Sequence, residues 1–290
     1  MLEKYYFLFF IALIWIIFAT LQDLKTREVS NWLNFSLISI ALAYRGFYSA
    51  FIGDYSFLLF GLLGFGLFFI LGNVFYYAKV FAGGDAKLLM GLGAVLPFES
   101  YSDLAIVSLS FIFILFLVGT AYSLIYTVFL VYQNKNKFKK EFNKTLDSCK
   151  NLFIISIFFS ALLLIFLWQS VMWIFIIAFL FTLPLLYIYL LALERSCMIK
   201  LVDVDKLTEG DWLEQEVRIG GHIIRKNVHG LSLKDIEKLK KAKKKVLIKE
   251  GIPFVPAFLI SFLVMVFFFL VLELDLQKLL FSFLSLLALF

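Results

Sequence analysis

The sequence predicts an all-α, polytopic membrane protein with a small cytoplasmic α+β domain inserted before its last main span. Hydrophobic residues make up 62% of the 290 residues, and phenylalanine alone accounts for 37 of them. A soluble globular domain is only about 45–50% apolar. Apolar runs of the length that crosses a bilayer, roughly 20 residues, recur along the chain. We therefore expect most of this chain to be membrane helix.

About eight transmembrane helices are expected. The candidate spans are residues 5–22, 31–52, 56–78, 86–97, 104–132, 151–169, 171–193 and 253–273. The run 86–97 is short and is interrupted by Gly91 and Gly93, which is tolerated where protein or a wet cavity surrounds the helix. A last apolar tail, residues 279–290, is too short to span a bilayer alone.

The distribution of lysine and arginine predicts the orientation of the spans. Residues 133–150 and 194–252 hold most of these cations, which places both segments in the cytoplasm. Counting back through the spans puts residues 23–30 and 79–85 on the same side and the N-terminus outside. The same rule explains the net charge of +6, so no nucleic-acid partner is expected. The predicted domains are a transmembrane part, a cytoplasmic domain and a C-terminal span with its tail, at residues 1–193, 194–252 and 253–290.

The predicted cytoplasmic domain contains short strands and one helix. Residues 198–202 and 217–224 have the composition of strands. Ser232 and Asp235 resemble a capping box that opens a short helix, and one face of this helix would carry Leu233, Ile236 and Leu239.

Charge is divided within this domain. The stretch 234–249 is strongly basic and is expected to lie on the anionic headgroups of membrane lipids. The preceding part is acidic, and it is expected either to attract a basic substrate segment or to form a solvated face. Its acidic residues are Asp203, Asp205, Glu209, Asp211, Glu214 and Glu216.

Other polar residues point to no metal or cofactor. Cys149 and Cys197 form no C-x-x-C pair, and the sequence contains no H-E-x-x-H motif. Arg45 lies inside the second span, where its long side chain is expected to snorkel to the outer face of the membrane.

Two acidic residues stand where an apolar run meets a charged loop. Asp23 follows the first span and Asp85 precedes the short run, so both are expected at the cytoplasmic edge of the membrane. Carboxylates at membrane depth are costly and are therefore candidates for function. Two neighbouring carboxyl groups share one proton, so that one takes a proton from water while the other donates to a peptide carbonyl. The pair thus predicts an aspartyl peptidase.

The residues beside Asp85 suggest how a substrate approaches. Gly83 and Gly84 lack side chains, so a substrate backbone could pass close to Asp85, although they could equally serve only to turn the chain into a helix. Asp85 begins a helix, whose dipole favours a carboxylate, whereas Asp23 ends one. We therefore expect Asp85 to be the ionised member and Asp23 to carry the shared proton.

The motifs resemble those of type IV prepilin peptidases. The segment D-x-K-x-R-x-V-S-N, which begins at Asp23, is similar to the first catalytic segment of that family, and G-G-D-A-K, residues 83–87, is similar to its GxGD segment. The run G-I-P-F-V-P at residues 251–256 resembles the start of the family's last main span. The first glycine of GxGD is Ala82 here, and the helical pair expected at 151–193 is additional to the simplest members.

The resemblance implies an activity and a substrate. The missing C-x-x-C pairs and the cytoplasmic domain look like the archaeal branch, the preflagellin and prepilin peptidases. In such an enzyme Asp23 and Asp85 would be the catalytic pair, without a cofactor. The substrates would be pilin-like or archaellin precursors, whose short basic leader is removed at the cytoplasmic face of the cell membrane.

Two other classes of function compete with this interpretation. A proton- or cation-coupled transporter using Asp23 and Asp85 would have its acids near the bilayer midplane and broken helices in paired halves. Here both acids stand at one edge, and no paired halves are evident. A non-catalytic pilus assembly protein would not need the two aspartates. The sequence therefore favours the peptidase.

Overall fold

The computed structural model describes residues 3–167, 171–219, 222–227, 230–241 and 245–270. The chain divides into two compact units: unit 1 is Met1–Leu124 with Ile252–Phe290, and unit 2 is Ile125–Gly251. This division differs from the predicted membrane and cytoplasmic domains, whose boundaries concern location and stay a prediction. The apolar tail 279–290 lies outside the described residues.

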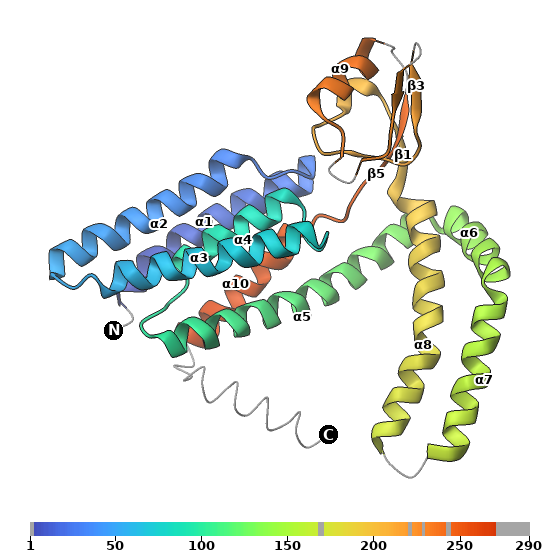
Figure 1. Cartoon of the computed structure of the whole chain (residues 1–290), viewed down its shortest axis with the longest axis horizontal. Helices are drawn as coiled ribbons and strands as arrows, with labels where there is room; N and C mark the ends of the chain where they lie inside the picture. Colours follow the sequence, from blue (N-terminus) through green and yellow to red (C-terminus); the bar gives the residue numbers. More distant parts are fainter. Residues whose placement is uncertain (1–2, 168–170, 220–221, 228–229, 242–244, 271–290) are drawn as a thin grey trace. The chain divides into compact units, whose positions relative to one another are not determined.

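Unit 1 is built from packed helices (Figure 1). Its described helices are α1 (Glu3–Thr26), α2 (Asn31–Ile52), α3 (Ser56–Tyr77), α4 (Gly83–Val95), the first part of α5 (Tyr101–Gln133) and α10 (Val255–Leu270). Each coincides with a run that the sequence predicted as a span. Helix α4 packs against α2 and α3, while α1 packs against α10.

Hydropathy and length qualify five described helices as membrane spans: α1, α2, α3, α5 and the helical stretch Phe175–Met198. A bent pair, Lys135–Ser148 with Lys150–Leu163, would raise the number to six. The predicted helices α4 and α10 exist, but α4 has only 13 residues and the described part of α10 has 16. The structure is therefore mostly helical with five or six candidate spans.

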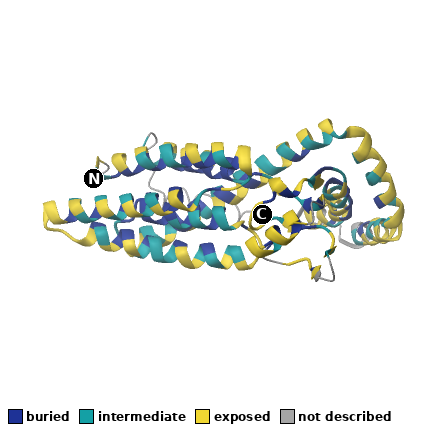
Figure 2. Ribbon diagram, turned by 90° about the horizontal axis from the view of Figure 1, so that it is seen from above, coloured by how far each residue is buried: buried dark blue, intermediate teal, exposed yellow. Residues whose placement is uncertain are grey.

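Burial follows the helix period in unit 1. Figure 2 shows buried residues on the inner sides of packed helices and exposed residues on their outer sides. Many exposed side chains are large and apolar, among them Phe10, Phe18, Phe47 and Ile70. An outer surface of this kind suits lipid, and a soluble protein rarely exposes so much contiguous apolar area.

Glycines bring α3 and α4 together. A Cβ on Gly93 would lie 2.7 Å from the carbonyl oxygen of Gly64 and 2.5 Å from Cβ of Phe68. A Cβ on Gly72 would lie 2.9 Å from the carbonyl oxygen of Ala86. Protein therefore surrounds the short helix α4, and its glycines are needed for close packing.

The predicted snorkelling of Arg45 is wrong. Its side chain is fully buried, with 0% exposure, and it hydrogen-bonds to carbonyl oxygens at the C-terminal end of α4. The physical reason is that a helix end offers unpaired carbonyl groups and the negative end of the helix dipole, which can satisfy a buried guanidinium.

Unit 2 begins with the rest of α5 and three further helices, which are α6 (Lys135–Ser148), α7 (Lys150–Leu167) and α8 (Val171–Leu193). Helices α7 and α8 pack together, and the Ser156 hydroxyl donates to the carbonyl of Leu180. A π-helical turn, η1 (Glu194–Met198), ends α8 and leads into a small sheet region.

The sheet region contains the two predicted runs: 198–202 provides one strand and 217–224 provides two, while Trp212–Leu213 and Val246–Lys249 are strands that were not predicted. Strand β5 (Val246–Lys249) pairs antiparallel with β1 (Ile199–Val202) and β2 (Trp212–Leu213), and β3 (Val217–Ile219) pairs with β4 (His222–Ile224). A 3₁₀ turn, η2 (Val204–Lys206), and helix α9 (Leu233–Lys241) complete it.

The predicted capping box opens α9. The Ser232 hydroxyl donates to Oδ2 of Asp235 at 2.6 Å, and the Asp235 N–H donates back to the Ser232 hydroxyl at 3.3 Å. Ile236 and Leu239 are buried in the core of this region, but Leu233 is 60% exposed. The predicted apolar face of the helix is therefore narrower than expected.

Candidate active site

Asp23 continues the buried stripe of α1. The stripe includes Tyr5, Ala12, Ile16 and Ala19, and Asp23 falls one turn after Ala19 with only 6% of its surface exposed. The helix ends directly afterwards, where Arg27 takes a left-handed conformation with φ 62° and donates its N–H to the carbonyl of Asp23. The sequence spacing thus directs this carboxylate into the protein.

The carboxylate of Asp23 meets the start of α10. Its Oδ2 accepts a hydrogen bond from the backbone N–H of Val255 at 3.0 Å. Val255 is the first residue of α10, so its N–H has no partner within the helix. A carboxylate in this position is stabilised by the N-terminal end of the helix dipole.

Asp85 is the third residue of α4 and is 8% exposed. Its Oδ2 accepts the N–H of Ala82 at 3.3 Å, which holds the side chain over the first turn of its own helix. Ala82 has φ −69° and ψ 164°, an extended conformation that any residue adopts. Alanine in place of the first motif glycine therefore causes no backbone strain.

The structure places Asp23 and Asp85 at the same end of unit 1. The two carboxyl groups are close enough for the charge of Asp23 to act on Asp85. Next to them, the side-chain amide of Asn34 donates to the carbonyl of Gly84 at 3.3 Å. Lys87 donates to Oδ1 of Asn31 at 2.6 Å. These contacts fix the start of α4 against the start of α2.

Gly84 packs closely against a neighbouring residue, and nothing in the sequence indicated this contact. A Cβ on Gly84 would lie 3.3 Å from Cβ of Val29, in the loop after α1. A Cβ on Gly83 would lie 3.7 Å from the ring of Tyr76, an ordinary contact distance. The role of the two glycines in substrate approach stays a prediction, and Gly83 is the position where an added Cβ would meet only an ordinary contact.

Aromatic rings pack beside the pair. The Phe81 ring lies 5.1 Å from that of Phe75 and 5.5 Å from that of Phe254, between centroids. Phe254 also packs on Gly119 of α5, where a Cβ would lie 2.5 Å from its ring. This packing anchors the entry to α10 and thereby the N–H of Val255.

Sequence reasoning missed two residues of this arrangement. In the sequence, Asn34 is a single polar residue within an apolar span, which gives no sign of its contact. Val255 contributes only its backbone N–H, which no side chain signals. The contact from Val255 also removes the basis for placing the shared proton on Asp23, because each carboxylate now meets a helix N-terminus.

The donor set of the site consists of carboxyl groups. Among the described residues, no group of three or more His, Cys, Asp and Glu side chains lies together as a metal site would require. Two carboxyl groups within electrostatic range favour a state with one proton between them. Such a pair can take a proton from water and give one to a carbonyl oxygen.

The fold and the site define a multi-pass, helical membrane protein with a buried pair of aspartates at one end of its helices. Within this class, residues 10–124 match the model of the type IV leader peptidase family. Both aspartates fall inside that range, whereas Val255 falls outside it.

Curated archaeal proteins are similar over part of the chain. The preflagellin peptidase of Methanocaldococcus jannaschii is 35% identical over 89 residues, which are 31% of this chain and 38% of that protein. The preflagellin peptidase of Methanococcus voltae is 32% identical over 97 residues, 32% of this chain and 41% of that protein. A prepilin peptidase of Methanothermobacter thermautotrophicus is 26% identical over 165 residues, 51% of this chain and 42% of that protein.

The chain thus spans less than half the length of these relatives in each alignment. No solved structure is significantly similar to it. The resemblance read from the two aspartate motifs is confirmed by the family match.

Proposed function

We propose that this protein is a membrane-embedded aspartyl endopeptidase that removes the leader peptide from pilin-like or archaellin precursors. One observation carries the proposal: Asp23 and Asp85, from two separate helices, lie as buried carboxyl groups within electrostatic range of each other, inside the region that matches the leader peptidase family. The names of the similar proteins, preflagellin and prepilin peptidase, support the substrate class.

The proposed mechanism uses one water molecule and the carboxyl pair. The ionised carboxylate takes a proton from the water as it attacks the scissile carbonyl carbon, and the protonated carboxyl donates to the carbonyl oxygen. The N–H groups of Val255 and Ala82 each hold one carboxylate oxygen, which leaves the other oxygen of each group for water or substrate. Neither step needs a cofactor.

The exposed acidic residues of unit 2 support a basic leader as the recognised segment. Asp203 forms an ion pair with Lys245 at 3.1 Å, and Glu214 forms one with Lys226 at 3.4 Å. Asp205, Glu209 and Glu216 are also exposed. Carboxylates on one segment attract a basic peptide and raise the rate of encounter. We assign this acidic segment, residues 203–216, to docking of the leader.

We also propose the topology predicted by the charge distribution, with about eight spans, the N-terminus outside and the aspartate pair facing the cytoplasm. The contacts of unit 1 support two opposite ends. Lys4 pairs with Glu99 at 3.1 Å and lies over the Phe57 ring, so these residues share one end. Asp23 and Val255 mark the other end. The exposed lysines of α9, Lys234, Lys238, Lys240 and Lys241, suit anionic lipid headgroups.

Labelling of single cysteines tests this orientation. Cys149 and Cys197 are replaced by serine, and cysteine is placed at Lys79 or at Asp54, which are both exposed. A membrane-impermeant maleimide applied to intact cells should label the Asp54→Cys protein and spare the Lys79→Cys protein. The reverse pattern would place the aspartates outside and contradict the proposed topology.

Cleavage of a precursor tests the activity. Membranes that contain the protein are mixed with a pilin-like precursor with a basic leader, and the products are identified by mass spectrometry. We expect one cut between the leader and the hydrophobic helix, at a rate that falls when the leader lysines become glutamine. Absence of any cut across archaellin and pilin precursors would overturn the proposed function.

A further inference from the structure

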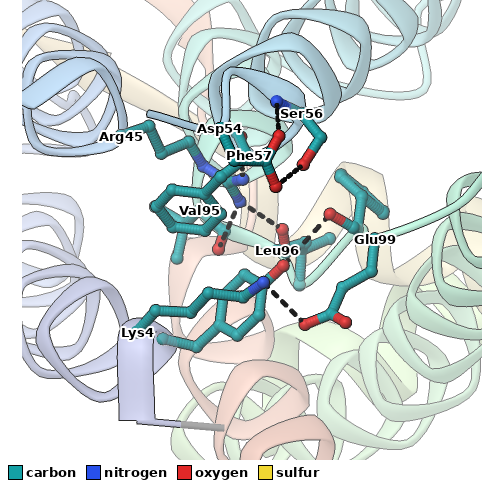
Figure 3. A network of polar contacts seen from close by, with 10 residues as sticks. Lys4, Arg45, Asp54, Ser56, Phe57, Val95, Leu96 and Glu99 are labelled. Atoms are coloured by element: carbon teal, nitrogen blue, oxygen red, sulfur yellow. Dashed lines mark hydrogen bonds and ion pairs between the residues drawn. The ribbon is translucent and has the colours of Figure 1, made fainter. Parts of the chain in front are cut away.

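Arg45 of α2 is the largest fully buried side chain in the described part of the chain. Its Nε donates to the carbonyl of Ala94 at 2.9 Å and its Nη2 to that of Leu96 at 2.7 Å. Its Nη1 donates to the carbonyl of Phe57 at 2.9 Å. Figure 3 shows the guanidinium directed at the end of α4, with Phe57 beside it.

These bonds satisfy groups that α4 cannot satisfy by itself. The last carbonyls of a helix have no partner within it, and Pro97 prevents α4 from continuing. A guanidinium has five N–H donors in a fixed plane, so one side chain serves several carbonyls. Its positive charge also meets the negative end of the α4 dipole.

The surroundings are shaped for this side chain. A Cβ on Gly61 of α3 would overlap the Arg45 side chain. The Phe57 ring lies 4.5 Å from the guanidinium carbon, within the range of a cation–π contact. Nearby, the hydroxyl of Tyr5 donates to the carbonyl of Phe98 at 3.0 Å, which fixes the chain just after α4.

The same helix carries Asp85 at its opposite end. Helix α4 has 13 residues, Asp85 is its third, and Ala94 and Val95 are its last two. Glycine contacts with α3 set the distance between the two helices, and the hydrogen bonds made by Asn34 and Lys87 hold the start of α4 against α2. The Arg45 hydrogen bonds are directional and fix the opposite end of α4 along the helix axis.

We propose that Arg45 is a positioning residue, which sets the place of Asp85 opposite Asp23 by holding the far end of α4. The catalytic consequence rests on the proposed peptidase function. The effect of Arg45 on the position of the N-terminal end of α4 does not depend on the proposed function.

The geometric test measures the distance between α1 and α4 at the aspartate end. Nitroxide labels are attached to cysteines at Lys25 and Ala82, both exposed, in protein with Cys149 and Cys197 replaced by serine. Electron paramagnetic resonance should show one narrow distance distribution in the parent. In Arg45→Gln the distribution should shift or broaden, and in Arg45→Lys it should change less.

Two further variants separate positioning from folding. Gly61→Ala keeps the arginine but displaces its side chain, so it should change the label distance like Arg45→Gln. If Arg45→Gln does not accumulate in membranes, the label distance in Gly61→Ala still tests whether Arg45 positions α4. Glu99→Gln is the matched control, because it removes only the ion pair of Glu99 with Lys4 at the rim of the same network and should leave the distance unchanged.

The catalytic test compares kcat and KM for precursor cleavage. A displacement of about 1 Å can cost roughly a hundredfold in rate, so kcat should fall strongly in Arg45→Gln and Gly61→Ala, with KM nearly constant and partial recovery in Arg45→Lys. A fall in kcat with an unchanged label distance would overturn the proposal, as would unchanged distances in both variants. If the parent cuts no precursor, the proposed function fails, and the label distance alone decides the role of Arg45.

Discussion

The carboxylate of Asp23 accepts a hydrogen bond from the backbone N–H of Val255, 232 residues later in the chain. The contact joins the first helix of the chain to its last described helix. Val255 lies outside the range matched by the leader peptidase family, residues 10–124, while Asp23 lies inside it. The two aspartate motifs therefore supply the carboxyl groups, and α10 supplies part of their support.

Replacing Val255 by proline should slow precursor cleavage. Proline is accepted at the first position of a helix, but it lacks the N–H that Asp23 accepts. Hydrogen bonds to charged groups contribute about 1.5–3 kcal/mol, so kcat should fall about tenfold or more relative to Val255→Ala, which keeps the N–H. Equal rates for the two variants would show that this hydrogen bond does not support the reaction.

Replacing Gly93 by alanine should lower the stability of the protein. In Gly93→Ala the new methyl group would meet the carbonyl of Gly64 and the Cβ of Phe68, and overpacking of this kind typically costs about 1–3 kcal/mol of stability. The thermal unfolding midpoint of the purified protein in detergent should fall. Gly66→Ala is the control on the neighbouring helix, because nothing lies within 4 Å of its Cβ, and its midpoint should not fall. A drop of the same size in both variants would rule out this contact as the cause.

Gly83 and Gly84 should respond differently to alanine. Gly84→Ala presses on Val29 and should lower the unfolding midpoint, whereas Gly83→Ala meets Tyr76 at an ordinary 3.7 Å and should leave it unchanged. If a substrate backbone passes close to Gly83, KM should rise in the stable Gly83→Ala variant. An unchanged KM would limit Gly83 to turning the chain into α4.

Charge reversal in the acidic segment should weaken binding of a basic leader. The double variant Asp205→Lys, Glu209→Lys should raise KM for a lysine-rich leader, with kcat unchanged, because both side chains are exposed and, in the proposed function, act only in docking. A precursor whose leader lysines are replaced by glutamate should be cut better by this variant than by the parent. If both proteins prefer the lysine-rich leader equally, the acidic segment plays no part in docking.

The positions of the apolar helices could be read from the sequence because apolar runs alternate with charged or glycine-containing loops, whereas the polar helix α6 was not predicted. The inward direction of Asp23 was not predicted, because the exposed side of α1 is apolar as well and only the structure shows that Ile16, Ala19 and Asp23 share the buried stripe. The place of Asp85 in the first turn of α4 followed from the motif and from the helix that begins there.

Other features depend on which elements become neighbours. Whether Arg45 reaches the membrane surface or the end of α4 depends on where α4 packs, and the sequence of α2 alone holds no information on this. Likewise, the N–H of Val255 has no side-chain signature. Leu233 sits at the edge of the helical face whose centre holds Ile236 and Leu239, so the period alone overstated its burial.

The most direct test of the central claim replaces each aspartate by the isosteric amide. Asp23→Asn and Asp85→Asn keep an oxygen for the N–H groups of Val255 and Ala82, but neither amide can act as the proton acceptor of a carboxyl pair. Precursor cleavage is measured in membranes with equal amounts of each protein. The account predicts that both variants lose cleavage while the parent cuts the precursor. Cleavage by both variants at the rate of the parent would contradict it.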